Sequence, residues 1–407
     1  MTPHRWLRLS FINLLLVATL GILLRYKIAF SLPFIDQKHI LHSHSHFAFT
    51  GWVTHTLLLL MVLYLQKKQQ TNSFKKYNFL LLLNLLSGYG MLVSFIIQGY
   101  AFFSITFSTL SIFTSFIFAY YYWRDLNKIS AEGITHHWFK AALIFNIISS
   151  FGAFSLAAIM LLKLVNQHIY LSSVYYFLHF QYNGWFFFAC MGLFFYLSGL
   201  HLARGASTIF WLLALACVPA YFLSVLWIAI HPLLYWMVVL ASITQTAGWL
   251  LFIRLLYKNV ATLKVHLSKN SQWLFLLSVI ACSIKITLQQ FSVIPFLSTL
   301  AFSFRPIIIG YLHLVLLGVI TLFLLGYIVA SQLIKTDKKF FTGIAIFVAG
   351  IFINELLLMI QGVTAITSTL MPYINELLLA AAFILFMGIL AINLFIKKGS
   401  YTYPTIQ

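Results

Sequence analysis

The sequence predicts an all-α integral membrane protein of about twelve transmembrane helices in three pseudo-repeated four-helix units. Two observations predict it: long apolar runs fill the chain, and a histidine motif recurs at intervals of one third of its length. Of the 407 residues, 62% are hydrophobic and 8% are charged, and the mean hydropathy is +0.97. Soluble domains carry roughly a quarter charged residues, so this composition excludes a soluble protein.

A bilayer core of about 30 Å is crossed by about 20 apolar residues of helix. Runs of this length are separated by short polar breaks, and the first lacks a small-residue signal cleavage site. We expect one membrane domain over 1–407, with repeat units at about 1–130, 131–265 and 266–407. The expected helices are 8–30, 44–65, 77–98, 101–122, 138–163, 174–199, 207–229, 232–253, 272–292, 306–329, 340–361 and 375–396.

The formal net charge of +19 is explained by topology. With a cytoplasmic N-terminus, 19 of the 25 Lys and Arg residues fall in cytoplasmic segments, and Lys285 lies inside the ninth expected helix. This bias predicts both termini in the cytoplasm of a multi-pass protein of a bacterial inner membrane. The expected partner of the basic residues is membrane lipid and not nucleic acid. The five on the other face are Arg25, Lys27, Lys38, Lys163 and Arg305.

The three cysteines, Cys190, Cys217 and Cys282, all fall inside expected helices. Their spacing forms neither a disulfide framework nor a zinc motif. We therefore interpret them as small packing residues.

A short motif recurs in the second helix of each expected unit. It reads histidine, four residues, glycine, then tryptophan or valine. The intervals between the histidines are 133 and 134 residues, and each interval holds four helices. Three copies in register predict an internal repeat. The copies are His46 to Trp52, His179 to Trp185 and His313 to Val319.

Each of these histidines lies within about two helical turns of the outer end of its helix. Ionisable side chains at membrane depth are costly and generally serve a function inside the bundle. The glycine one turn below removes a side chain on nearly the same face, so a flat macrocycle could lie close to the backbone. His55, nine residues past His46, is expected on the opposite face of that helix.

This architecture resembles subunit I of the haem-copper oxidases, in which histidines also stand at the outer ends of helices 2, 6 and 10. The segment His44-Ser45-His46-Phe47-Ala48-Phe49 is similar to the histidine-rich helices of nitric oxide reductases. The glycine and tryptophan after the histidine resemble the NnrS-type haem and copper membrane proteins. The resemblance covers nearly the whole chain as architecture and only short motifs as sequence.

The resemblance implies a low-spin haem held from its two faces by His46 and His313. His42, one turn before His46 on the same face, is the rival ligand. Two histidine ligands leave no open iron position, which suits electron transfer. The chain has no Cys-x-x-Cys-His motif, so the haem is expected to be b-type and non-covalent.

The family's second metal site is matched only in part. His179 stands on the sixth helix and His231 alone at the outer end of the seventh, where the family has a pair. Tyr311 occupies the position of the family's additional haem ligand on the tenth helix. A two-histidine copper site and a second haem both remain open, because imidazole binds copper and iron alike.

Six other charged positions are candidates. Arg305 is eight residues before His313, and with Arg25, Lys27 or Lys38 it could bind haem propionates; the alternative is an interfacial anchor. Lys285 and Glu355 lie deep in the ninth and eleventh helices. They could form an ion pair that packs helices together, or belong to separate proton paths.

We therefore expect a haem-dependent membrane oxidoreductase or a haem-based sensor. It would take electrons from a quinol or a cytochrome c and handle a diatomic gas, oxygen or nitric oxide. The alternatives are a twelve-helix secondary transporter, which the threefold repeat disfavours, and a catalytically inactive oxidase-like scaffold or nitric oxide response protein. Fold analogy alone does not decide among these.

Overall fold

The computed structural model describes residues 1–69, 74–130 and 133–399. The chain divides into two compact units. Unit 1 comprises residues 1–129 together with the chain from residue 331 onward, and unit 2 comprises residues 130–330. The first expected repeat boundary, at about 130, coincides with a unit boundary. The third expected repeat is divided between the units at residue 331.

Unit 1 is helical apart from two short strands. Its elements are α1 (Pro3–Ala29), α2 (Gln37–Phe47), η1 (Ala48–Thr54), α3 (His55–Gln69), α4 (Phe74–Gln98), α5 (Phe102–Leu126), β1 (Ile334–Lys335), α16 (Lys338–Ile366), α17 (Ile374–Phe395) and β2 (Lys397–Lys398). The strands pair antiparallel, with Ile334 opposite Lys398.

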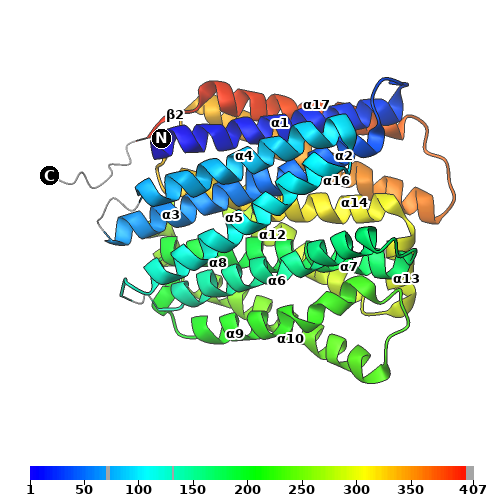
Figure 1. The fold of residues 1–407 in the computed structure, drawn as a ribbon. Coiled ribbons are helices and arrows are strands. Elements are labelled where there is room, and N and C mark those ends of the chain that lie inside the picture. Colours follow the sequence, from blue (N-terminus) through cyan, green and yellow to red (C-terminus); the bar gives the residue numbers. More distant parts are fainter. Residues whose placement is uncertain (70–73, 131–132, 400–407) are drawn as a thin grey trace. The chain divides into compact units, whose positions relative to one another are not determined.

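The first and last helices of the chain lie side by side in unit 1 (Figure 1). The Nδ2 atom of Asn393 on α17 donates to the carbonyl of Phe11 on α1 over 3.0 Å. The other side of α17 packs on α16, where Gly388 allows the backbone of Phe347 to approach closely. Unit 1 is thus completed by elements from both ends of the sequence.

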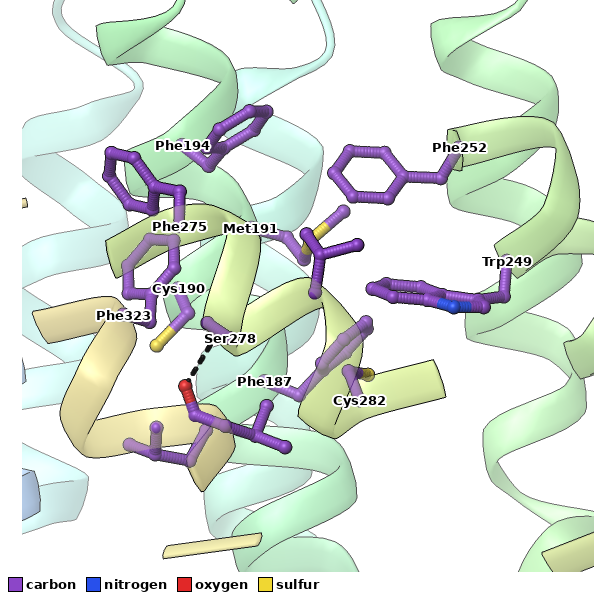
Figure 2. Close-up of a pocket in the computed structure, with 13 residues that line it drawn as sticks. Phe187, Cys190, Met191, Phe194, Trp249, Phe252, Phe275, Ser278, Cys282 and Phe323 are labelled. Atoms are coloured by element: carbon purple, nitrogen blue, oxygen red, sulfur yellow. Dashed lines mark hydrogen bonds between the residues drawn. The ribbon is translucent and has the colours of Figure 1, made fainter. Parts of the chain in front are cut away.

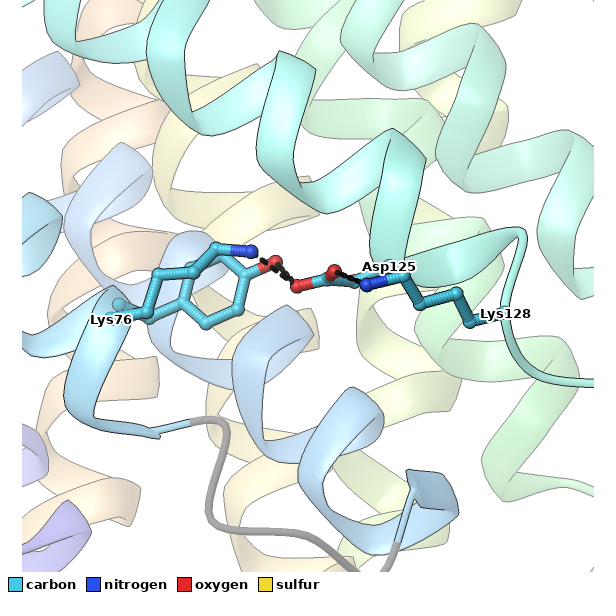
Figure 3. Close-up of polar contacts among 4 residues, drawn as sticks. Lys76, Asp125 and Lys128 are labelled. Carbon is cyan, nitrogen blue, oxygen red and sulfur yellow. Dashed lines mark hydrogen bonds and ion pairs between the residues drawn. The ribbon is translucent and has the colours of Figure 1, made fainter.

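A buried carboxylate joins α4 to α5 near one end of unit 1 (Figure 3). Asp125 accepts from Lys76 Nζ at 2.6 Å, from the Tyr77 hydroxyl at 2.8 Å and from Lys128 Nζ at 3.2 Å. The side chain of Asp125 is only 8% exposed, so its three donors balance the loss of water. This cluster fixes the ends of the two helices against each other.

Unit 2 is contiguous in sequence. Its elements are α6 (Thr135–Leu161), α7 (Gln167–His179), η2 (Phe180–Phe186), α8 (Phe187–Leu197), η3 (Leu200–Leu202), α9 (Ala206–Cys217), η4 (Pro219–Val225), α10 (Pro232–Lys258), α11 (Val260–His266), α12 (Lys269–Phe291), α13 (Pro295–Ser303), α14 (Arg305–His313), η5 (Leu314–Thr321) and α15 (Leu322–Ala330).

Aromatic side chains form much of the interior of unit 2. The Trp138 ring of α6 stacks on Phe195 of α8 at a centroid distance of 5.6 Å and meets Phe210 of α9 edge-on at 5.0 Å. Such pairs add about 0.5–1.5 kcal/mol each beyond the area that they bury. They hold α6, α8 and α9 together without polar atoms.

Within the described residues, ten helices are long and apolar enough to cross a membrane, or eleven if one bent pair counts as a span. The chain is therefore a multi-pass membrane protein. The bent pair is Ala206–Cys217 with Pro219–Val225, at 45°, and it corresponds to the expected helix 207–229. The expected helix 174–199 corresponds to α7, η2 and α8, where the polar Gln181 and Asn183 lower the mean hydropathy.

Candidate functional site

Three π-helical segments occupy the places that the repeated motif marks. They are η1, η2 and η5, and each begins one or two residues after a repeat histidine. The π-helix is rare and is found frequently at functional sites. The backbone therefore distinguishes the same three positions as the sequence motif. The histidine and glycine of each segment are His46 and Gly51, His179 and Gly184, and His313 and Gly318.

The repeat glycines admit neighbouring side chains and helices. A methyl group on Gly184 would lie 2.6 Å from Cβ of Phe145 on α6, and one on Gly318 would lie 3.1 Å from Cβ of Ala281 on α12. The Phe47 ring covers Gly51. Protein atoms therefore lie against all three glycines. The expectation that the glycines make room for a macrocycle stays a prediction.

A helix that packs on each of the first two π segments contributes a buried asparagine. Asn13 of α1 donates from Nδ2 to the Gly51 carbonyl over 2.6 Å and accepts from the Tyr89 hydroxyl at 2.8 Å. Asn146 of α6 accepts from Gln181 Nε2 at 3.0 Å. The two asparagines are 133 residues apart, the same interval as the first two repeat histidines. The interval is readable in the sequence, but the histidine motif contains neither asparagine.

His46 lies in an aromatic bracket at one end of unit 1. It is half-buried and stacks on Phe95 of α4 with ring centroids 4.5 Å apart. Its Nε2 is 2.8 Å from the Tyr100 hydroxyl. His42 meets the Tyr100 ring edge-on at 4.6 Å, so the rival ligand belongs to the same cluster. The Tyr100 hydroxyl can donate to Nε2 of a neutral imidazole, the form that binds metal.

His313 is held in a metal-binding tautomer. Its Nδ1 lies 2.8 Å from the carbonyl of Ile309, one turn earlier on α14. A carbonyl only accepts, so Nδ1 carries the proton and Nε2 carries the lone pair. Metal-bound histidines are generally oriented by such a bond. His46 and His313 belong to different units, and each is described against its own neighbours.

His179 is buried and hydrogen-bonded through both ring nitrogens. Its Nε2 lies 2.8 Å from the Cys217 carbonyl, and its Nδ1 lies 3.1 Å from Nδ2 of Asn183. The Cys217 sulfur is 4.0 Å from Nε2. His231 is exposed and caps α10, with its Nδ1 accepting from the backbone N–H of Leu233 at 3.3 Å. A shared metal site of His179 and His231 remains a prediction.

Tyr311, at the position of the family's additional haem ligand, faces a second tyrosine. Its ring is 6.1 Å from that of Tyr182 on η2, in an edge-on arrangement. Both residues lie in unit 2, near the buried Cys282 and Lys285 of α12.

The candidate proton-path residues have local neighbours of their own. Lys285 is 4% exposed and lies within electrostatic range of Cys217 and Cys282 in unit 2. Glu355 on α16 accepts from Nδ2 of Asn354 at 3.1 Å and lies within electrostatic range of Arg25 of α1 in unit 1. The expected Lys285–Glu355 pair remains a prediction, because the two residues belong to different units.

The candidate propionate partners differ in their surroundings. Arg305 is exposed and is the first residue of α14, and Lys38 is exposed at the start of α2. Lys27 donates to the carbonyl of Leu32 over 2.6 Å. The exposed pair suits either a carboxylate ligand or a lipid headgroup, and their role in binding propionates stays a prediction.

An apolar pocket lies within unit 2 (Figure 2). Rings of Phe194 and Phe275 stand on one side and rings of Trp249 and Phe252 on the other. The Ser278 hydroxyl is bonded to the Val319 carbonyl at 2.7 Å. The cavity holds about 40 Å³, far below the roughly 300–1,000 Å³ of a drug-sized site. It suits a small apolar molecule and excludes a haem.

Among residues 1–69, 74–130 and 133–399, no group of three or more His, Cys, Asp or Glu side chains is arranged to hold a metal ion. A haem held by two histidines does not require such a group. No protein family model matches the chain, and no curated protein sequence is significantly similar to it. The family resemblance therefore rests on architecture and the histidine motifs alone.

Proposed function

We propose that the chain is a b-type haem membrane protein of the haem-copper oxidase subunit I type, which transfers electrons or handles a diatomic gas. The observation that carries the proposal is the set of three π segments, each beginning one or two residues after a repeat histidine. Unusual backbone at membrane depth persists where it positions a functional group. Three such segments at equivalent positions favour a repeated unit in which each copy places a histidine beside a π-helix.

The proposal includes twelve spans with both termini in the cytoplasm of a bacterial inner membrane. Ten spans meet the length and hydropathy requirement in the described residues. The bent pair α9 and η4 would be the eleventh, and α7, η2 and α8 together the twelfth. The positive-inside bias of the sequence sets the orientation.

His46 and His313 would hold the haem iron through Nε2. The iron supplies reversible one-electron chemistry when it is bound. The Ile309 carbonyl keeps His313 in the ligand tautomer. The ring of Phe95 stacks on the His46 imidazole and orients its plane. The hydrogen bond between the Tyr100 hydroxyl and Nε2 shows that Nε2, the proposed ligand atom, is accessible from the side of Tyr100. Arg305 is the nearest basic residue in sequence for a propionate of a haem on His313.

The test is an optical spectrum of the purified full-length protein, oxidised and dithionite-reduced. We expect sharp reduced α and β bands that are lost in His46→Ala and in His313→Ala. His44→Ala is the matched control, because His44 lies on the same helix and its Nδ1 bonds the Val17 carbonyl at 3.0 Å. His42→Ala separates the rival ligand from His46.

Carbon monoxide addition would then show whether a second, open iron is present. Absence of haem absorbance after expression in a haem-replete host would contradict the proposal. The same result would favour the transporter and scaffold alternatives over a haem protein.

A secondary transporter is the second candidate, and one observation favours it. Arg25 and Glu355 lie within electrostatic range of each other on two membrane-spanning helices of unit 1. Ionisable residues in spans commonly serve ion or proton coupling. Substrate-dependent flux into proteoliposomes, abolished by Glu355→Gln and without bound haem, would support this candidate.

A further inference from the structure

The adjoining ends of α4 and α5 in unit 1 carry more positive charge than their carboxylate neutralises (Figure 3). Lys75 and Lys76 stand in the first turn of α4, Arg124 stands in the last turn of α5, and Lys128 follows that helix. Among the described residues of these two ends, Asp125 is the only acidic one. Four cations therefore meet one carboxylate, which leaves an excess of three positive charges.

The carboxylate is engaged by the two lysines, and the arginine is not part of that cluster. The Asp125 oxygens lie 2.6 Å from Lys76 Nζ and 3.2 Å from Lys128 Nζ. Arg124 is exposed and forms no ion pair within the described part of the chain. Its guanidinium lies 6.0 Å from the centre of the Tyr120 ring. This contact positions the arginine and leaves its charge unneutralised.

The ring of Tyr121 brings two of the cations close together. Lys76 Nζ lies 4.4 Å from the centre of this ring, and the Arg124 guanidinium lies 5.6 Å from it. Two positive charges beside one ring repel each other, and an anion between them lowers that energy. The Lys76 side chain is 32% exposed, and its ammonium has three donors. It can therefore bond a second anion while it stays bonded to Asp125.

Exposed apolar side chains continue from these cations into the membrane-spanning part of both helices. On α5 a stripe follows Arg124 at steps of four and three residues, which places its members on one face. They are between 42% and 64% exposed. The members are Tyr120, Ile117 and Phe113. An equivalent exposed stripe follows Lys75 on α4. Its members are Phe79, Leu82 and Leu86.

We propose that these two helix ends bind an anionic phospholipid of the phosphatidylglycerol type. Its phosphate accepts from Arg124 and Lys76, and its acyl chains lie along the exposed stripes. Arginine binds phosphate well because its planar fork donates two parallel hydrogen bonds. The excess of positive charge disfavours a zwitterionic lipid, since the ammonium of that headgroup is repelled. Basic clusters at the cytoplasmic end of a span are typical sites for anionic lipids.

The position of the stripes selects a lipid over a soluble anion. Tyr120 lies one helical turn from Arg124, and Phe79 lies one turn from Lys75. A molecule that contacts both the cations and the stripes carries a phosphate joined to hydrocarbon. The sequence indicates lipid as the partner of the basic residues in general, whereas the contacts of Tyr121 select one pair of cations. The proposal does not depend on a haem.

The experiment is native mass spectrometry of the purified full-length protein in detergent. The protein is titrated with an equal mixture of phosphatidylglycerol and phosphatidylethanolamine that have the same acyl chains. We expect the wild type to retain phosphatidylglycerol in preference. Arg124→Gln should weaken that binding by about fivefold or more, as loss of one basic residue at an anionic headgroup does. Arg124→Lys keeps the charge without the fork and should weaken binding by less.

Arg254→Gln is the matched control. Arg254 is also exposed near the end of a membrane-spanning helix, α10, but it has no cation–π contact in the described residues. Lys76→Gln should weaken binding of phosphatidylglycerol as well. Far-UV circular dichroism shows that each variant keeps its helix content, and Arg124→Gln is expected to fold because Arg124 is exposed.

Equal retention of the two lipids by the wild type would overturn the proposal. So would a loss in Arg254→Gln as large as that in Arg124→Gln, because binding would then follow overall charge. Glycerol 1-phosphate, the soluble part of the headgroup, is the competitor. Displacement of phosphatidylglycerol by an equal concentration of glycerol 1-phosphate would assign the site to a soluble anion and would also overturn the proposal.

Discussion

The first and second π segments share a backbone plan and differ in everything that surrounds the histidine. In both, the segment begins one or two residues after the histidine, holds the repeat glycine and packs on a helix that carries a buried asparagine. Around η1, His46 is half-buried between the aromatic rings of Phe95 and Tyr100. Around η2, His179 is buried against an amide and a thiol.

The difference teaches that one backbone plan occurs in two different surroundings. The imidazole of His46 lies against aromatic rings, whereas that of His179 is hydrogen-bonded through both ring nitrogens. Repetition in the sequence therefore predicts where the histidines lie, whereas contacts between helices determine the neighbours of each one.

The strongest way to break this comparison is to measure haem absorbance in a variant of each histidine. His46→Ala should abolish the haem bands of the proposed haem. His179→Ala should leave the bands intact, because both ring nitrogens of His179 are engaged in hydrogen bonds to the protein. Optical spectra of the two purified variants measure the difference, and loss of the bands in His179→Ala would contradict the comparison.

The glycines provide the next largest effect. Gly184→Ala should destabilise the protein by about 2–3 kcal/mol, because its new methyl group meets the Phe145 Cβ, which cannot rotate away. Gly318→Ala should cost less, since the Ala281 Cβ is 3.1 Å from the new atom instead of 2.6 Å. Thermal unfolding in detergent measures the difference. Equal melting temperatures would contradict the tighter packing of η2.

The buried asparagines should also differ. Asn13→Ala removes the donor to the Gly51 carbonyl and the acceptor of the Tyr89 hydroxyl, at a cost of about 1–2 kcal/mol. Asn146→Ala should cost less, because Gln181 Nε2 also donates to Ser149 at 2.7 Å and keeps that bond. A larger loss of stability in Asn146→Ala than in Asn13→Ala, measured by the same thermal unfolding assay, would contradict this prediction.

A variant remote from both π segments provides the baseline and the smallest effect. Asp337 caps α16 by accepting from the Phe340 backbone N–H at 2.9 Å and pairs with Lys397 at 3.1 Å. These contacts hold the pKa of Asp337 below its ordinary value of 3.8. A depressed pKa means that the carboxylate stabilises the fold above about pH 4, and that this contribution fades as the pH falls through the folded-state pKa.

Asp337→Asn should therefore lower the melting temperature slightly at pH 7 and by less in acid, with the haem absorbance unchanged. A difference in melting temperature from the wild type that grows as the pH falls would contradict the assignment of this cap. A change in haem absorbance would show that the assay of the π segments responds to general loss of stability.

Much of the fold was predictable because the length of each apolar run can be read from the sequence and indicates a membrane-spanning helix. Each expected helix falls on helical residues, including 174–199, which the structure divides into α7, η2 and α8. The π segments were not predictable by the same reasoning, since hydropathy does not distinguish i→i+5 from i→i+4 bonding. For that reason the expected face of His55 is unreliable, because all of η1 lies between it and His46.

The candidate site was predictable only at its repeated members. The interval of the motif indicates His46, His179 and His313, but contacts between distant helices leave no periodic trace. Cys217 meets His179 through the packing of α9, and Tyr100 meets His46 from the turn after α4. His231 is the reverse case, because Pro232 directly after it is a sign of a helix start. The capping role of His231 was therefore readable locally.

The pairing of α1 with α17 has a consequence for the order of synthesis. Asn393 and Phe11 are 382 residues apart, and a ribosome adding about 5–20 residues per second needs roughly 20–75 s to make the chain between them. All of unit 2 emerges within that interval. Helix α1 can therefore pack on α2 and η1 early, whereas its contact with α17 forms only after unit 2 has been synthesised.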